Sequence, residues 1–210
     1  MIKELEKRLI TSLILIPVSI FFITKGSIFF IFFLSILFLA ASYEWILMTK
    51  RNNLFRLLGI IFLFFSFYSA FKFGENYKDF LFIITICIFT DIGGYVFGKT
   101  FKGPKLTSIS PNKTYTGVIG SFLFSLIAGL VFIKYFWSSE TYKTDIDQFL
   151  VLLIIITISL VSQIGDLIIS YFKRKAKLKD TGKILPGHGG LLDRIDGLIF
   201  VIPSIYLLSL

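Results

Sequence analysis

The chain has 210 residues, of which 55% are hydrophobic and 26 are phenylalanine, and its mean hydropathy is +0.83. A composition this apolar excludes an ordinary water-soluble domain and indicates an integral membrane protein. The formal net charge is +9, which in a membrane protein is more typical of topology and anionic lipid than of nucleic acid. We therefore expect a lipid bilayer and no nucleic acid among its partners. A single cysteine, Cys87, excludes an intramolecular disulfide framework.

Long apolar runs follow one another along the chain and predict an all-α fold, a polytopic transmembrane helical bundle of about seven spans. The first two runs share only a tight turn at Lys25-Gly26, without a small-residue cleavage site, so we expect no cleaved signal peptide. Each run is close to the ~20 residues that a helix needs to cross a bilayer. The predicted spans are 9–24, 27–49, 54–71, 80–98, 114–136, 149–172 and 190–210.

The basic residues predict how these spans are oriented. With a cytoplasmic N-terminus, 17 of the 22 lysines and arginines fall on the cytoplasmic side, as the positive-inside rule expects. An odd number of spans then places the C-terminus outside. The five cations on the other side are Lys25, Lys72, Lys78, Lys134 and Lys143.

Five carboxylates lie within or at the ends of the predicted spans, all toward the cytoplasmic side: Glu44, Asp91, Asp166, Asp193 and Asp196. A charge near lipid is costly, so each of them needs a partner or a function. For Glu44 we favour a structural interpretation, either pairing with a lysine or capping by a backbone amide. For Asp91 pairing with a loop lysine is about as well supported as a metal or substrate role.

Three of these acids predict a metal site. Asp193 and Asp196 are three residues apart, which places them on the same face of a helix. Asp166 precedes the basic loop on the neighbouring span, and that loop folds the two helix ends together. Oxygen ligands at a membrane surface suit Mg²⁺, which commonly shares them with substrate phosphates. With one histidine and one cysteine, a dedicated zinc site is not expected.

Two polar loops on the predicted cytoplasmic side have the residues of a phosphate-binding site. The first, 185–190, reads Leu-Pro-Gly-His-Gly-Gly, and its glycines can bring backbone N–H groups against a phosphate. The cations around it are also explained in part by topology and anionic lipid. The second loop carries Ser110, Lys113 and Thr114 before a helix, where such residues either cap the helix or bind an anion.

Together these motifs resemble the phosphatidate cytidylyltransferases, also called CDP-diacylglycerol synthases. The family signature S-x-x-K-R, K-D-x-G, L-P-G-H-G-G and D-R-x-D stands here within residues 170–196. S-x-x-G-D at 162–166, D-x-G-x-Y at 91–95 and S-P-x-K-T at 110–114 resemble further family segments. The chain departs from the family at Ile169, where an acid is common, and in a short N-terminal third. The resemblance covers roughly residues 85–200.

The resemblance implies an enzyme of phospholipid biosynthesis that transfers a cytidylyl group from CTP to phosphatidate, forming CDP-diacylglycerol and pyrophosphate. It would be an integral protein of the bacterial inner membrane with its site facing the cytoplasm, and a homodimer is a further expectation. Residues 1–84 would be N-terminal transmembrane helices and 85–210 the catalytic transmembrane region. The implied catalytic residues are Asp166, Asp193, Arg194 and Asp196, with Asp166, Asp193 and Asp196 holding Mg²⁺ and a second cation sharing the site. The implied substrate-binding residues are Ser110, Lys113, Thr114, Lys173, Arg174 and His188.

Three alternatives are weighed against this interpretation. A CDP-alcohol phosphotransferase would carry D-G-x-x-A-R, and no such string occurs here. A transporter would distribute its acids through the membrane depth, whereas these cluster at one surface. A shortened, inactive relative that acts as a membrane-binding partner is disfavoured by the intact signature.

Overall fold

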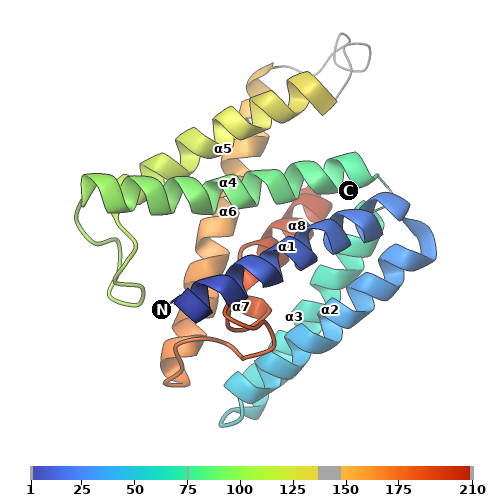
Figure 1. Cartoon of the computed structure of the whole chain (residues 1–210), viewed down its shortest axis with the longest axis vertical. Helices are drawn as coiled ribbons and strands as arrows, with labels where there is room; N and C mark the ends of the chain where they lie inside the picture. Colours follow the sequence, from blue (N-terminus) through green and yellow to red (C-terminus); the bar gives the residue numbers. More distant parts are fainter. Residues whose placement is uncertain (1, 75, 137–147, 209–210) are drawn as a thin grey trace.

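The computed structural model describes residues 2–74, 76–136 and 148–208, and within these ranges regular structure is helical apart from two isolated β-bridges. The prediction of an all-α fold is therefore confirmed (Figure 1). Asn52 and Asn76 begin α3 and α4 as side-chain caps, which accept hydrogen bonds from Phe55 N and Lys78 N. The helices are α1 (Ile2–Lys25), α2 (Ser27–Met48), α3 (Asn53–Phe73), α4 (Tyr77–Phe101), α5 (Tyr115–Phe136), α6 (Gln148–Lys175), α7 (Leu192–Ile195) and α8 (Leu198–Leu208).

Five of these helices, α2 to α6, are long and apolar enough to cross a membrane. Their bounds lie within three residues of the predicted spans, because long hydrophobic runs leave little freedom about where a helix sits. Two further apolar stretches are shorter, Ile10–Lys25 within α1 and Leu198–Leu208 as α8. The predicted turn between the first two spans is present at Gly26, whose φ of 62° is readily available to glycine.

The last predicted span, 190–210, is wrong in its first part. Helix α7 contains only four residues, and α8 begins at Leu198. Asp196 is the C-terminal cap of α7 instead of a residue within a long helix. The carboxylates of this segment bind partners elsewhere in the fold, and these contacts interrupt a stretch that hydropathy alone predicts as continuous helix.

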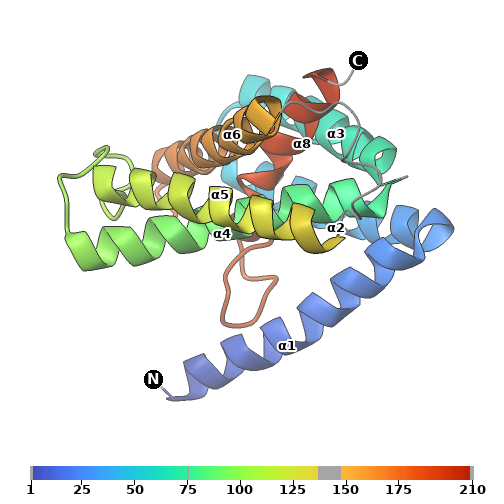
Figure 2. The same ribbon diagram turned by 90° about the horizontal axis from the view of Figure 1, so that it is seen from above.

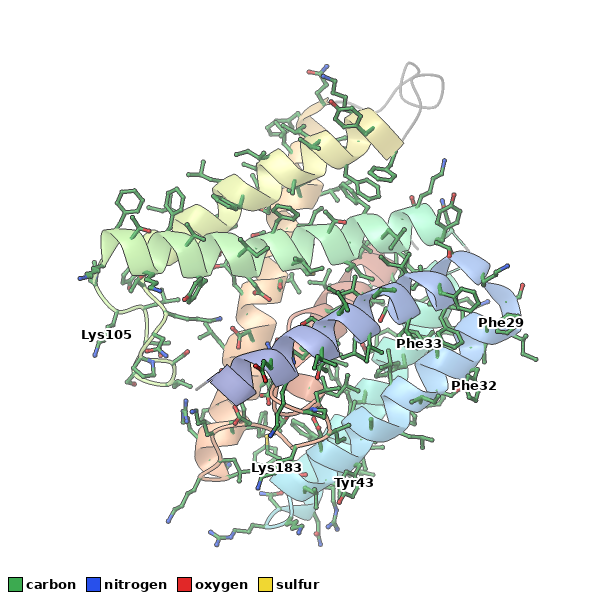
Figure 3. All side chains as sticks on the ribbon, in the orientation of Figure 1. Phe29, Phe32, Phe33, Tyr43, Lys105 and Lys183 are labelled. Atoms are coloured by element: carbon green, nitrogen blue, oxygen red, sulfur yellow. The ribbon has the colours of Figure 1, made fainter. Side chains whose placement is uncertain are left out.

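The long helices alternate in direction, so one end of the bundle gathers the polar loops. This end holds the start of α1, the α2–α3 turn, the α4–α5 loop and the loop from α6 to α7 (Figure 1). Figure 3 labels Lys105 and Lys183 on the loops at this end, whereas Phe29, Phe32 and Phe33 lie near the opposite end of α2. The predicted clustering of basic loops at one end of the bundle is thus present in the fold.

Helices α4 and α5 pack with their backbones in close approach. A Cβ added at Gly93 would collide with the Gly120 carbonyl oxygen, and one at Gly117 would lie 2.8 Å from the Gly94 carbonyl oxygen. Small residues at such a crossing let two membrane helices come together without side chains between them. This close packing fixes the end of α4, which carries Asp91, against the start of α5.

The end of the loop between α6 and α7 is packed into a hydrophobic cluster of the helix bundle. Leu191 and Leu192 are buried together with Trp45 of α2, Leu63 of α3 and Ile169 of α6. Burying each large side chain of this kind contributes about 1.5–3 kcal/mol relative to exposing it. The glycine-rich loop is therefore anchored into the helix bundle at its C-terminal end.

Candidate active site

The side chain of Glu44, a residue of α2, inserts into the loop that joins α6 and α7, and it is fully buried with 0% exposure. Its Oε1 accepts a hydrogen bond from Leu191 N at 2.9 Å. Its Oε2 accepts from Leu192 N at 2.9 Å and from Thr181 Oγ1 at 2.8 Å. The interpretation of Glu44 as capped by backbone amides is confirmed, and the residue also ties α2 to the loop.

The glycines of this loop make room for that carboxylate. A Cβ at either Gly182 or Gly190 would meet the Glu44 carboxylate. Gly187 and Gly189 have φ values of 76° and 84°, which few residues other than glycine adopt. The loop was predicted to turn its backbone amides toward a phosphate. The amides of Leu191 and Leu192, which follow this loop, bind the Glu44 carboxylate, and phosphate binding by 185–190 stays a prediction.

Asp193 binds the opposite side of the same loop. Its Oδ2 accepts from Thr181 N at 2.9 Å and from Gly190 N at 3.0 Å, and its Oδ1 accepts from Lys173 Nζ at 2.8 Å. The side chains of Lys173 and Asp193 are only 12% and 8% exposed. Removing one partner of such a buried ion pair strongly destabilises the folded protein, because the other charge is left uncompensated.

A second ion pair joins the α4–α5 loop to α6. Lys113 Nζ lies 2.5 Å from Asp166 Oδ2, and it also donates to the carbonyl oxygen of Gln163 at 3.4 Å. Ser170 Oγ donates to Asp166 Oδ1 at 3.3 Å. A cation is unfavourable at the positive end of the α5 dipole, and here the Asp166 carboxylate of α6 compensates the charge of Lys113.

Asp166 and Asp196 lie close enough for their charges to interact. Asp91 adds a third negative charge that acts on both of them, and Lys173 interacts electrostatically with Asp166 and Asp196 as well as with Asp193. The two ion pairs therefore belong to one network of alternating charges. Such a network can accept further polyvalent groups with little rearrangement, because its charges are already held in place.

A cavity of about 300 Å³ opens at this network, between α4, α5 and the facing side of α6. It is lined on the α4 side by Asp91 and Tyr95, and on the α6 side by Gln163 and Asp166. The loop before α5 contributes the three residues predicted there for substrate binding, Ser110, Lys113 and Thr114. The structure thus brings four predicted site residues and Asp91 around one hollow.

The remaining predicted phosphate ligands contact loop carbonyls. Arg194 donates from Nε and Nη2 to the His188 carbonyl oxygen, at 3.2 and 2.6 Å. Arg174 donates to the carbonyl oxygens of Ile109 and Leu178, each at 3.4 Å, and so bridges the two polar loops. Thr114 accepts from Gly117 N at 3.1 Å, which is the capping role weighed for it. These contacts order the loops around the cavity.

Helix α1 contributes contacts that sequence reasoning did not anticipate. Thr11 Oγ1 donates to the Pro186 carbonyl oxygen at 2.9 Å, and Ser12 Oγ lies 3.2 Å from His188 Nε2. Figure 2 shows the loop extending from the bundle toward α1. No signal within α1 marked these hydroxyls, because they are single polar residues at the start of an apolar run. Thr181, which was also missed, stands inside the recognised K-D-x-G motif.

The carboxylates of the site meet the requirements of Mg²⁺ only in part. Within the described part of the chain, no group of three or more histidine, cysteine, aspartate or glutamate side chains is arranged to hold a metal ion. Asp193 binds two backbone amides and Lys173, whereas Asp166 and Asp196 face each other. A pair of facing carboxylates fits an ion that is usually bound by one or two carboxylates together with substrate phosphates. Mg²⁺ at Asp166 and Asp196 therefore stays a prediction, with Asp193 placed on the loop side.

Comparison with known proteins gives a consistent result. The cytidylyltransferase family model matches residues 54–210, which is most of the chain. The chain belongs to this family. A protein from Rickettsia bellii named phosphatidate cytidylyltransferase is 32% identical over 212 residues, which covers 98% of this chain and 91% of that protein. A protein of the same name from Rickettsia typhi is 33% identical over 95% of this chain and 89% of its own length.

The staphylococcal members of the family are longer than the matched region. A phosphatidate cytidylyltransferase from Staphylococcus saprophyticus is 41% identical over 136 residues, which is 64% of this chain and 50% of that protein. The chain thus spans about half the length of the staphylococcal relatives.

Proposed function

We propose that this chain transfers a cytidylyl group from CTP to phosphatidate, forming CDP-diacylglycerol and pyrophosphate. The observation that carries the proposal is the match to relatives of this name over almost the whole chain. The arrangement of the site supports it, because Ser110, Lys113, Thr114 and Asp166 line one cavity at the polar end of a membrane bundle. A lipid substrate reaches such a site laterally and a nucleotide reaches it from water.

The reaction depends more on stabilising negative charge than on acid–base catalysis. An oxygen of the phosphatidate phosphate forms a bond to the α-phosphorus of CTP. The bond from that phosphorus to the oxygen bridging the β-phosphate breaks, and pyrophosphate leaves with this oxygen and its electron pair. The nucleophile is already an anion, so a strong general base is not required. Bringing two polyanions together instead requires fixed cations.

Lys113 and Lys173 are the cations best placed for this role. A lysine ammonium has three N–H donors, so a lysine that binds a carboxylate still has donors for a phosphate oxygen. Asp166 and Asp193 hold the two ammonium groups in position before the substrate arrives. This preorganisation lowers the reorganisation that the site must undergo as charge develops on the transferring group.

Asp166 and Asp196 are the residues that would hold Mg²⁺. When bound, the ion neutralises charge on the phosphate oxygens of CTP. Arg174 and Arg194 order the loop carbonyls around the cavity, and His188 lies against Ser12 of α1. We place the site at the cytoplasmic face of the bacterial inner membrane, which the clustering of basic loops at this end supports.

The proposal is tested by incorporation of labelled CTP into lipid, using purified protein with phosphatidate in detergent micelles. We expect label in CDP-diacylglycerol, release of one pyrophosphate for each lipid formed, and a strong loss of both in Asp166→Asn. Asp79→Asn is a matched control, because Asp79 lies in the first turn of α4, away from the polar loops, and pairs with Asn76. No labelled lipid from the unsubstituted protein would refute the proposed function.

A further inference from the structure

Glu44 is the only carboxylate of the described spans for which 0% exposure is recorded, and it lies outside the region that the family model matches, 54–210. It belongs to α2, yet all three of its hydrogen-bond donors come from residues more than 130 positions later. Those donors are two backbone amides and one hydroxyl. The carboxylate is thus held by neutral donors around the loop that carries the family signature.

Substituting Glu44 or its hydrogen-bond donors should be strongly unfavourable. A carboxylate taken out of water is stabilised only if its oxygens are well hydrogen-bonded, and the donors left without it are themselves costly to bury. Gly182 and Gly190 leave space for this group, since a Cβ at either position would meet it. Glu44 and the loop are therefore matched in shape as well as in hydrogen bonding.

Thr181 connects Glu44 to the ion pair of Asp193 and Lys173. Its hydroxyl donates to Glu44 Oε2 at 2.8 Å, and its backbone N–H donates to Asp193 Oδ2 at 2.9 Å. Asp193 in turn holds Lys173. On the other strand of the loop, Gly190 N binds Asp193 while the next two amides bind Glu44. Glu44 and Asp193 thus hold the same two segments of the loop from opposite sides.

We propose that Glu44 is a positioning residue for the transfer reaction, which fixes Asp193 and Lys173 toward the substrate by clamping residues 181 and 190–192 onto α2. This inference rests on the proposed function. Glu44 does not touch the substrate itself, since its oxygens face the interior of the loop. Its removal should therefore lower kcat more than it raises the KM for CTP, because the ground-state contacts lining the cavity come from other residues.

The test uses two kinds of substitution in the full-length protein. Glu44→Gln keeps the shape but replaces one acceptor with a donor, which faces another donor. Thr181→Val removes only the hydroxyl that binds Glu44, and Thr181→Ser restores a hydroxyl at the same place. For each purified variant, kcat and the KM for CTP are measured per folded protein, with the folded fraction taken from size-exclusion profiles. Hydrogen exchange of the amides at 190–192 is measured by mass spectrometry on the same samples.

We expect kcat to fall by about tenfold or more in Glu44→Gln and several-fold in Thr181→Val, with the KM changing less than about threefold and Thr181→Ser retaining most of the rate. Amide exchange at 190–192 should accelerate in Glu44→Gln. Wild-type kcat in folded Glu44→Gln, or unchanged exchange, would overturn the proposal. If Glu44→Gln does not fold, a fully active Thr181→Val, or a Thr181→Ser as impaired as Thr181→Val, would overturn it.

The two failures are distinguishable. An unsubstituted protein that forms no CDP-diacylglycerol contradicts the proposed function, whatever the exchange rates show. An active unsubstituted protein with a fully active, folded Glu44→Gln contradicts the positioning role alone. Asp79→Asn serves again as the control for nonspecific effects of removing a carboxylate from a membrane helix.

Discussion

Replacing Asp193 by asparagine breaks the ion pair with Lys173 while keeping the size of the side chain. The asparagine carbonyl can still accept from Thr181 N and Gly190 N, as Oδ2 does now. Its amide group then faces the Lys173 ammonium, and both are donors. The loss is one charge-assisted hydrogen bond, worth about 1.5–3 kcal/mol, together with an uncompensated lysine that is only 12% exposed.

We therefore expect Asp193→Asn to destabilise the protein by about 3 kcal/mol, which is at the low end for breaking a buried pair. For a chain of this size that lowers the melting temperature by about 6–12 °C. If the pair is also required in the transition state, the same energy lowers kcat by about 150-fold. Both are measured on purified protein in one detergent, by thermal unfolding and by CTP incorporation.

A double-mutant cycle with Lys173→Gln tests the cause of the loss. Both single substitutions break the same ion pair, so the double variant should be little worse than the more damaged single variant. Lys173→Gln combined with Asp79→Asn is the control, and these two should add because they lie at opposite ends of the fold. Additive effects for Lys173 and Asp193, or a melting temperature for Asp193→Asn within about 2 °C of the unsubstituted protein, would refute the reasoning.

Three further predictions follow from the same contacts. Asp166→Asn should raise the Mg²⁺ concentration for half-maximal activity by about tenfold or more, and an unchanged Mg²⁺ titration would remove Asp166 from the metal site. Gly190→Ala should destabilise the protein by about 1–3 kcal/mol, because its Cβ meets the Glu44 carboxylate; an unshifted thermal unfolding curve would show that the loop adapts. Arg194→Lys keeps the charge but not the two-donor contact to the His188 carbonyl oxygen, so kcat should fall about 5–10-fold; unchanged kinetics would mean that Arg194 serves only topology.

The bundle was largely predictable because each long helix is encoded locally by its own apolar run. The bounds of α2 to α6 follow from hydropathy, and amide capping of Glu44 was one of the two structural interpretations, with lysine pairing, favoured from sequence. The last span was mispredicted because Leu191 and Leu192 are apolar whether they continue a helix or enter a loop. What decides between these outcomes is their amide contact with Glu44, across a separation of 147 and 148 residues.

The sequence predicted a group of acids at the polar end of the bundle, but it did not predict which partner each acid binds. The sequence indicated that Asp166, Asp193 and Asp196 act together, and a spacing of three supported a common face. In the fold, Asp193 faces the loop and Lys173, whereas Asp196 faces Asp166. Spacing along a helix fixes the direction of a side chain only while the helix continues, and α7 ends at Ile195. The pairing of Lys113 with Asp166 joins segments 53 residues apart, and no local pattern specifies it.

The glycine-rich loop shows why a phosphate-binding sequence does not by itself locate a phosphate. Glu44 and Asp193 accept hydrogen bonds from four backbone amides in and beside this loop, those of Thr181, Gly190, Leu191 and Leu192. A second anion cannot use the same donors. The side chains that carboxylates hold in place, Lys173 beside Asp193 and Lys113 beside Asp166, are therefore the groups that we expect to bind the proposed substrates. In this arrangement the loop acts by placing cations, and the carboxylates that fill it determine where those cations stand.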